Sequence, residues 1–117
     1  MNFMSMEVNR RQVGDVTVID ASGRITVSEE WNVICNELRN LTASGNRKIL
    51  LNLGDVSYID SSGIGELVAG FTSVVKAGGT MKLLNPTKRV KDLLRMTNLD
   101  TIFDVHEDEA NAVRSFV

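Results

Sequence analysis

Apolar and polar residues alternate at the start of the chain, and the alternation is interrupted once by a turn signal. Residues 6–8 and 16–18 carry Met or Val at every second position on the two sides of Gly14-Asp15. This pattern predicts a β-hairpin at the N-terminal end. We expect residues 21–23 (Ala-Ser-Gly) to break the second strand and residues 25–27 to extend it briefly.

Two longer segments carry apolar residues at intervals of three and four, which predicts amphipathic helices. The first is expected to follow a cap at Thr26 or Ser28, with Glu29 completing a capping box, and to end at Gly45. Its apolar positions are Trp31, Ile34, Cys35, Leu38 and Leu41. The second begins near Ser61 and stops at residues 77–79 (Ala-Gly-Gly), with apolar positions Ile64, Leu67, Val68, Phe71, Val74 and Val75.

The predicted strands between and after these helices complete an alternating order. Residues 48–53 are nearly all apolar, as is typical of a parallel strand covered on both faces, and residues 54–57 are expected to form a connection to residues 58–60. A strand at residues 80–84 leads to Asn85-Pro86, where proline would open a third helix. The inner face of that helix carries Val90, Leu93 and Leu94.

A short strand at residues 101–105 is expected before a last helix, which is marked by Ala110, Val113 and Phe116 and favoured at its start by acidic residues. The order β-β-α-β-α-β-α-β-α predicts an α/β fold. We expect one domain over residues 1–117, with a mixed sheet of about five strands packed with about four helices.

Composition narrows the class of protein. The 117 residues include 13 basic and 15 acidic side chains, so the net charge of −2 does not favour nucleic-acid binding. The single Cys35 excludes an internal disulfide and a multi-cysteine metal site. We find no apolar stretch of membrane-spanning length and no secretory signal, so we expect a cytoplasmic protein that does not insert into membranes.

The candidate chemistry lies in residues 60–65, which join a strand to the second helix and read Asp60, Ser61, Ser62, Gly63, Ile64 and Gly65. Asp and Ser are favoured helix caps, whereas two glycines in a first helical turn cost helix propensity. One interpretation is a capped helix whose glycines allow tight packing. The other is an exposed serine hydroxyl beside a carboxylate, where phosphorylation would add a charge of about −1.5 to −2 and alter a binding surface.

Residues 49–65 (ILLNLGDVSYIDSSGIG) resemble the signature of the STAS domain family, and more closely that of bacterial anti-sigma factor antagonists. Residues 77–79, 85–90 and 93–99 also resemble later elements of the family, so the similarity extends from about residue 14 to residue 116. The Asp-Ser-Ser-Gly segment after an apolar strand is its most specific part. The resemblance implies a STAS-like fold and a protein that works by binding and is not an enzyme.

The resemblance also implies partners and roles. When unphosphorylated, such a protein binds an anti-sigma factor that is a serine kinase, and so releases the sigma factor. The kinase would phosphorylate Ser61, and a PP2C-type serine phosphatase would restore the active form. Asp60 would shape the acceptor site, with Ser62, Gly63, Ile64 and Gly65 completing the partner-binding turn. We expect no cofactor on this chain, because ATP and magnesium would belong to the kinase.

Two positions depart from the family pattern. Thr26 stands where many relatives carry an acidic residue, which puts in question a polar contact from this loop to the acceptor site or to the kinase. Glu66 adds an acid directly after Gly65, where we expect an apolar or neutral residue. Both departures concern the choice of partner more than the fold.

Other functions receive less support. The turn is not a Gly-x-Ser-x-Gly elbow, and the single His106 is expected to be a solvated cap at a helix start. The segment from Gly63 to Val68 matches half of the Gly-rich fingerprint of dinucleotide-binding proteins. This fingerprint is a weak signal even when it is complete, so the sequence does not decide whether the protein binds a nucleotide weakly. A function from another class is a STAS accessory subunit of a membrane transporter or of a lipid-trafficking ATPase complex.

A basic cluster on the third predicted helix has two interpretations. Its members are Lys88, Arg89, Lys91 and Arg95, and three of them share one face by their spacing. We favour a solvated outer face around the apolar stripe. The alternative is a basic patch that steers an acidic partner surface.

Overall fold

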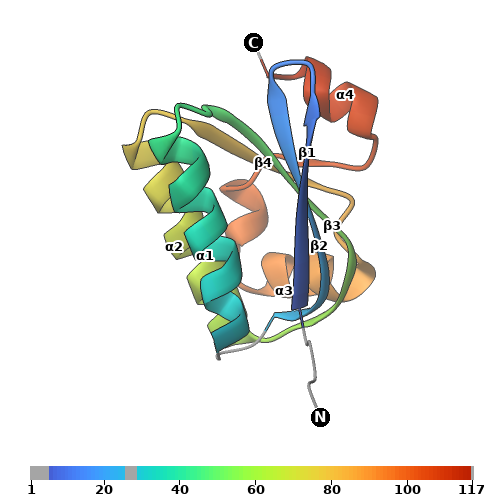
Figure 1. Ribbon diagram of the computed structural model, residues 1–117. Coiled ribbons are helices and arrows are strands. Elements are labelled where there is room, and N and C mark those ends of the chain that lie inside the picture. The colour runs from blue at the N-terminus through green and yellow to red at the C-terminus, as the bar shows by residue number, and fades with distance from the viewer. Residues whose placement is uncertain (1–5, 26–28, 117) are drawn as a thin grey trace.

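The computed structural model describes residues 6–25 and 29–116. Within them the chain forms a five-stranded sheet and four α-helices (Figure 1). The strands are β1 (Met6–Val13), β2 (Val16–Ile25), β3 (Lys48–Ile59), β4 (Thr80–Leu84) and β5 (Val105–His106). The helices are α1 (Glu29–Ala43), α2 (Ser61–Lys76), α3 (Lys88–Met96) and α4 (Glu109–Arg114), with a 3₁₀ turn, η1 (Leu99–Thr101), after α3. The predicted α/β fold with a mixed sheet is confirmed.

The sheet has the order β1-β2-β3-β4-β5, so every neighbour in space is also the next strand in sequence. Only β1 and β2 are antiparallel, and they form the predicted hairpin, which pairs Val13 with Val16 across a turn where Gly14 has a φ of 61°. The remaining strands run parallel, each returning through a helical connection. Such crossovers place helices over the sheet.

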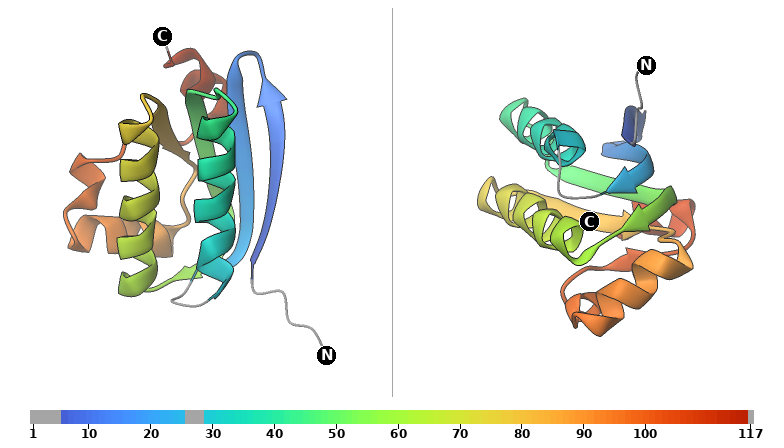
Figure 2. Two further views of the ribbon diagram at one scale, coloured as in Figure 1. Left: turned by 60° about the vertical axis from the view of Figure 1, so that its left-hand side comes forward. Right: turned by 90° about the horizontal axis from the view of Figure 1, so that it is seen from below.

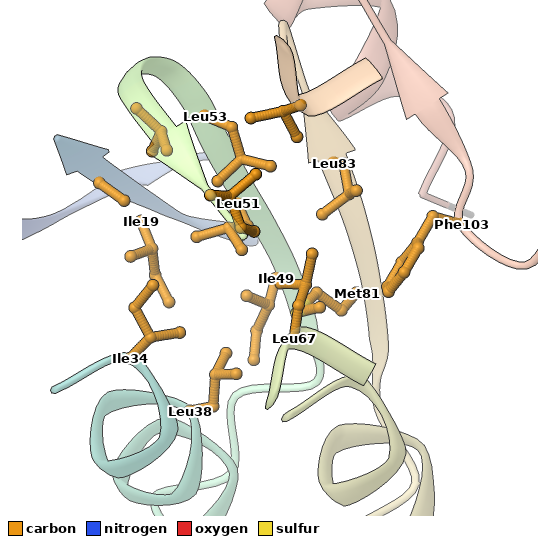
Figure 3. Packing of buried hydrophobic residues seen from close by; sticks show 14 of the residues in the cluster. Ile19, Ile34, Leu38, Ile49, Leu51, Leu53, Leu67, Met81, Leu83 and Phe103 are labelled. Carbon is orange, nitrogen blue, oxygen red and sulfur yellow. The ribbon is translucent and has the colours of Figure 1, made fainter. Parts of the chain in front are cut away.

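Two apolar layers hold the helices to the sheet. Helices α1 and α2 lie side by side on one face (Figures 1 and 2), and their buried side chains meet those of the strands in the main core. Figure 3 shows Ile34, Leu38 and Leu67 from these helices directed toward the strand residues Ile19, Ile49, Leu51 and Leu83. On the other face a smaller cluster contains Ala112 of α4. The near-continuous apolar run at the start of β3 reflects this burial on both faces.

Two predicted interruptions of the sheet are wrong. Residues 21–23 do not break β2, and residues 54–57 do not connect two segments, because both belong to strands that continue to Ile25 and Ile59. The parallel ladder shifts register between Asp20 and Ser22 and again between Gly23 and Arg24, and pairing continues to Ile25. Irregular pairing of this kind lets a ladder absorb an extra residue without ending. The glycines that resembled turn signals therefore lie within the strands.

The third helix and the last strand also begin later than predicted. Helix α3 starts at Lys88 after an N-cap at Thr87, so Pro86 precedes the helix and does not occupy its first position. Residues 99–101 form η1, and β5 is limited to Val105 and His106. His106 is therefore in a strand and half-buried, not a solvated helix cap.

Several other expectations can be placed. Helix α2 matches its predicted bounds, with Asp60 as the N-cap residue, and α1 buries Ile34, Leu38 and Leu41. The expected caps at Thr26 or Ser28, and the strand extension through Val27, lie outside the described residues. In the described part of the chain, no helix is both long enough and apolar enough to cross a lipid bilayer.

Candidate functional site

The candidate site is the single residue that separates β3 from α2, together with the first turn of that helix. Ile59 ends the strand and is buried in the core. Asp60 follows in an extended conformation, with φ of −107° and ψ of 178°, and α2 begins at the next residue. Because the strand end is held by the core and the helix by its apolar face, the position of the turn is fixed from both sides.

Asp60 closes the N-terminal end of α2 with both its side chain and its backbone. Its Oδ1 accepts a hydrogen bond of 2.7 Å from the backbone N–H of Gly63, and its carbonyl oxygen accepts one of 3.0 Å from the N–H of Ile64. An N-cap of this kind satisfies donors that otherwise have no partner within the helix. The carboxylate is therefore fixed to the turn at the positive end of the helix dipole.

Ser61 is exposed, although its neighbours on both sides are held in place. Gly63 and Ile64 are buried, and Asp60 is half-buried. Ser61 is thus an exposed residue that directly follows the capping aspartate in the chain, as the second interpretation of the motif requires. The side chains of Ser62 and Glu66, both singled out in the sequence, lie outside what the structure describes.

The glycines of α2 differ in what surrounds them. A β-carbon built at Gly65, which is exposed, would meet no described atom within 4 Å. A β-carbon at Gly70 would lie 2.8 Å from Cδ1 of Leu38, so Gly70 allows α1 and α2 to pack closely. Tight packing therefore accounts for Gly70, and it does not account for Gly65.

The structure adds an aromatic and cationic cluster that sequence analysis missed. The guanidinium carbon of Arg24, at the end of β2, lies 4.8 Å from the ring centroid of Tyr58, and that of Arg89, on α3, lies 4.3 Å from it. Both distances are within the range of cation–π attraction. Arg24 pairs with Tyr58 in the β2–β3 ladder. The pairing of β2 with β3 therefore accounts for the contact between Arg24 and Tyr58. No pattern in the sequence indicated the contact between Arg89 and Tyr58.

A groove of about 590 Å³ opens next to the turn. Its lining residues are Ile59, Lys88, Arg89, Asp92, Leu93 and Met96, so it runs between the end of β3 and α3. Figures 1 and 2 place α3 at the end of the molecule where α2 begins. The groove was not predicted, because the predicted helix and strand gave no indication of how α3 meets the end of β3.

The structure assigns the only histidine to another part of the molecule. Nε2 of His106 lies 3.1 Å from Oδ2 of Asp104 and 3.4 Å from Oγ of Ser115, near α4. Ser61 therefore has no imidazole base of this chain beside it, as a nucleophilic serine requires. The described residues also contain no group of three or more His, Cys, Asp or Glu side chains arranged to hold a metal ion.

Comparisons with known proteins concern the family and the fold of this chain. Residues 7–112 match the family model of the STAS domain. The anti-sigma-B factor antagonist of Bacillus subtilis (strain 168) is 32% identical over 111 residues, which cover 95% of this chain and 100% of that protein. A relative from Thermotoga neapolitana is 41% identical over 69 residues, which are 59% of this chain and only 61% of that relative's length.

The fold is also that of a solved Bacillus protein. The anti-sigma factor antagonist SpoIIAA in its unphosphorylated form superimposes with a TM-score of 0.76 at 22% identity, over 95% of this chain and 99% of that one. Its phosphorylated form gives a TM-score of 0.71 at 20% identity, over 92% of this chain and 97% of that one. At these identities the likeness concerns the arrangement of strands and helices.

Proposed function

This chain belongs to the STAS domain family, and we propose that it is an anti-sigma factor antagonist whose binding is switched by phosphorylation of Ser61. In the unphosphorylated form it binds an anti-sigma factor serine kinase, which then releases its sigma factor. The full-length similarity to an anti-sigma-B factor antagonist supports this class of function. The protein acts by binding and catalyses no reaction, and we place it in the cytoplasm.

The observation that carries the proposal is the exposure of Ser61 beside a fixed carboxylate. In the transfer, Oγ of Ser61 forms a bond to the γ-phosphorus of ATP held by the kinase, the bond from that phosphorus to the bridging oxygen breaks, and the hydroxyl proton passes to a base of the kinase. ADP departs with the kinase. A PP2C-type serine phosphatase later hydrolyses the phosphoester and restores the hydroxyl.

The added charge accounts for the switch. A phosphoserine carries about −1.5 to −2 charges at neutral pH. At a separation of ~6 Å and an effective dielectric constant of ~20, one unit charge on the phosphate and one on a nearby carboxylate, such as that of Asp60, repel by roughly 3 kcal/mol. Exposure to solvent reduces this energy, yet ~1.4 kcal/mol already changes a dissociation constant tenfold. A phosphate on Ser61 can therefore weaken docking without refolding the domain.

Phosphopeptide mapping tests the assignment of the acceptor. The full chain is incubated with ATP, magnesium and each purified candidate anti-sigma factor kinase encoded in the source genome, and the sites are read by mass spectrometry. We expect one phosphate on Ser61, absent from Ser61→Ala and retained in Ser57→Ala, a control at another exposed serine. Label on Ser62 alone would contradict the assignment. Co-purification with a transporter ATPase and no kinase would favour the accessory-subunit alternative.

A further inference from the structure

The groove beside the candidate phosphoacceptor turn, residues 60–65, has an apolar floor and an exposed apolar rim. Ile59, 1% exposed, lies at its base, and the half-buried Leu93 of α3 adds to the wall. Met96 on the rim is 79% exposed, the highest exposure among the large apolar side chains of the described residues. Methionine is flexible and polarizable, which suits a surface that must fit the side chains of another protein.

The charged side chains among the described residues around the groove have a positive balance. Nζ of Lys88 lies 3.1 Å from Oδ2 of Asp92, so the acidic side chain among the described lining residues is already paired. The guanidinium groups of Arg89 and Arg24 are held over Tyr58, and neither has a carboxylate within ion-pair distance among the described residues. Two positive charges are thus fixed in position and available to a partner.

The groove lies next to the candidate phosphoacceptor turn in the chain. Ile59, which forms its base, is followed in the chain by Asp60 and the exposed Ser61. None of residues 60–65 is among the described residues that line the groove, but the chain passes from Ile59 to Ser61 within two residues. Arg89 lines the groove, and Arg24 lies beside it over the same Tyr58 ring. We therefore treat the groove and the turn as neighbouring parts of one binding surface.

We propose that the groove docks a segment of the anti-sigma factor kinase in which an apolar side chain is flanked by carboxylates. The apolar side chain fills the space between Ile59 and Met96, and the carboxylates pair with Arg89 and Arg24. This inference rests on the proposed function and adds the chemistry of the partner. It also strengthens the switch, because an acidic segment held beside Ser61 is repelled by a phosphate placed there.

Substitutions on the rim test the groove with the kinase itself. We expect Met96→Asp and Arg89→Glu each to weaken binding of the unphosphorylated protein at least tenfold, and Met96→Leu to bind like the wild type. Val75→Asp and Lys76→Glu make matched changes at exposed positions near the other end of α2 and should bind normally. Unfolding midpoints measured in urea confirm that each variant is folded.

A peptide titration tests the groove independently of the kinase. The ¹⁵N-labelled full chain is titrated with a six-residue peptide of two central leucines flanked by glutamates, and with its lysine counterpart. We expect the acidic peptide to shift the amide signals of residues 88–96 and to bind at least tenfold more tightly than the basic one. Met96→Asp should abolish these shifts.

The two experiments separate the possible failures. If a kinase phosphorylates Ser61 but binds the rim variants like the wild type, the groove proposal is wrong and the phosphorylation switch stands. If no kinase acts on Ser61, the proposed function fails, and the peptide result alone decides whether the groove binds acidic segments. Equal shifts with both peptides, or shifts spread over the whole molecule, overturn the groove proposal in either case.

Discussion

The carboxylate of Asp60 accepts a hydrogen bond of 2.7 Å from the backbone N–H of Gly63, and the exposed Ser61 lies within the turn that this bond closes. One acidic side chain thus starts α2 and flanks the candidate phosphoacceptor. Its structural role and its proposed role in docking can be separated by substitution.

Replacing the capping carboxylate should destabilise the fold by a predictable amount. We expect Asp60→Ala to lower the free energy of unfolding by about 1 kcal/mol, the usual cost of losing an N-cap. Asp60→Asn keeps a side-chain acceptor and should stay within a few tenths of a kcal/mol of the wild type. Urea unfolding followed by circular dichroism measures both. Equal losses in the two variants would show that the cap bond is not what stabilises the start of α2.

Charge at Ser61 should control binding to the kinase. We expect Ser61→Asp to weaken the complex at least tenfold, whereas Ser61→Ala should preserve affinity and prevent phosphorylation. Ser57→Asp introduces the same charge at another exposed serine and serves as the control for position. Isothermal titration calorimetry provides the dissociation constants. Wild-type affinity in both Ser61 variants would refute the charge-switch mechanism.

Substitution of Gly65 should affect the affinity for the kinase more than the stability of the fold, because the space around this residue is open. Gly65→Ala should raise the free energy of unfolding by up to about 1 kcal/mol, because alanine is the better helix former and meets no described atom there. Gly70→Ala should be less stable than Gly65→Ala, since the new methyl group would press on the buried Leu38.

Gly65→Leu tests the docking role of the same position. The larger side chain projects from the exposed first turn of α2, so we expect the affinity for the kinase to fall while the urea midpoint changes little. Normal affinity in Gly65→Leu would show that a slim helix start has no part in binding.

We expect the free energy of unfolding to fall at acid pH, because the ion pairs that link β1, β2 and α4 lose their charge there. Nε of Arg11 lies 2.6 Å from Oδ2 of Asp20, and the same guanidinium pairs with Glu109. The hydrogen bond from Arg11 lowers the pKa of Asp20 below its ordinary value, and likewise lowers the pKa of Glu109. A carboxyl group whose pKa is lower in the folded protein than in the unfolded chain stabilises the fold at pH values above its unfolded pKa. This stabilisation is lost as the pH falls through the folded pKa.

Asp20→Asn measures this effect. Because the pair is partly exposed, we expect the variant to be less stable than the wild type by at most about 1 kcal/mol at pH 7. The difference should shrink as the pH is lowered below about 4, the ordinary pKa of an aspartate in the unfolded chain, and should vanish once the pH falls through the lowered pKa of Asp20 in the folded protein. Urea unfolding at several pH values tests this, and a difference that stays constant with pH would mean that the Arg11–Asp20 charge pair is not its source.

Local patterns in the sequence were sufficient for the elements that carry the candidate site. The hairpin around Gly14, the apolar run at the start of β3 and the helix beginning at Ser61 were all predicted, because each depends on side-chain period and capping within a few residues. The place of the candidate turn followed from the same short-range information, whereas the role of Ser61 as phosphoacceptor is a proposal that came from the resemblance to the STAS domain family. That Ser61 is exposed was the expectation on which the proposed switch depends, and the structure agrees with it.

Contacts between distant segments decided the rest. Residues 54–57 look like a connection by composition, but they form part of β3 because the end of β2 supplies a parallel partner for them. The cluster of Arg24, Tyr58 and Arg89 likewise joins β2, β3 and α3, and the groove exists only because α3 packs against the strand end at Ile59. A sequence pattern records the preference of each segment, whereas pairing and packing between segments depend on which surfaces the fold brings together.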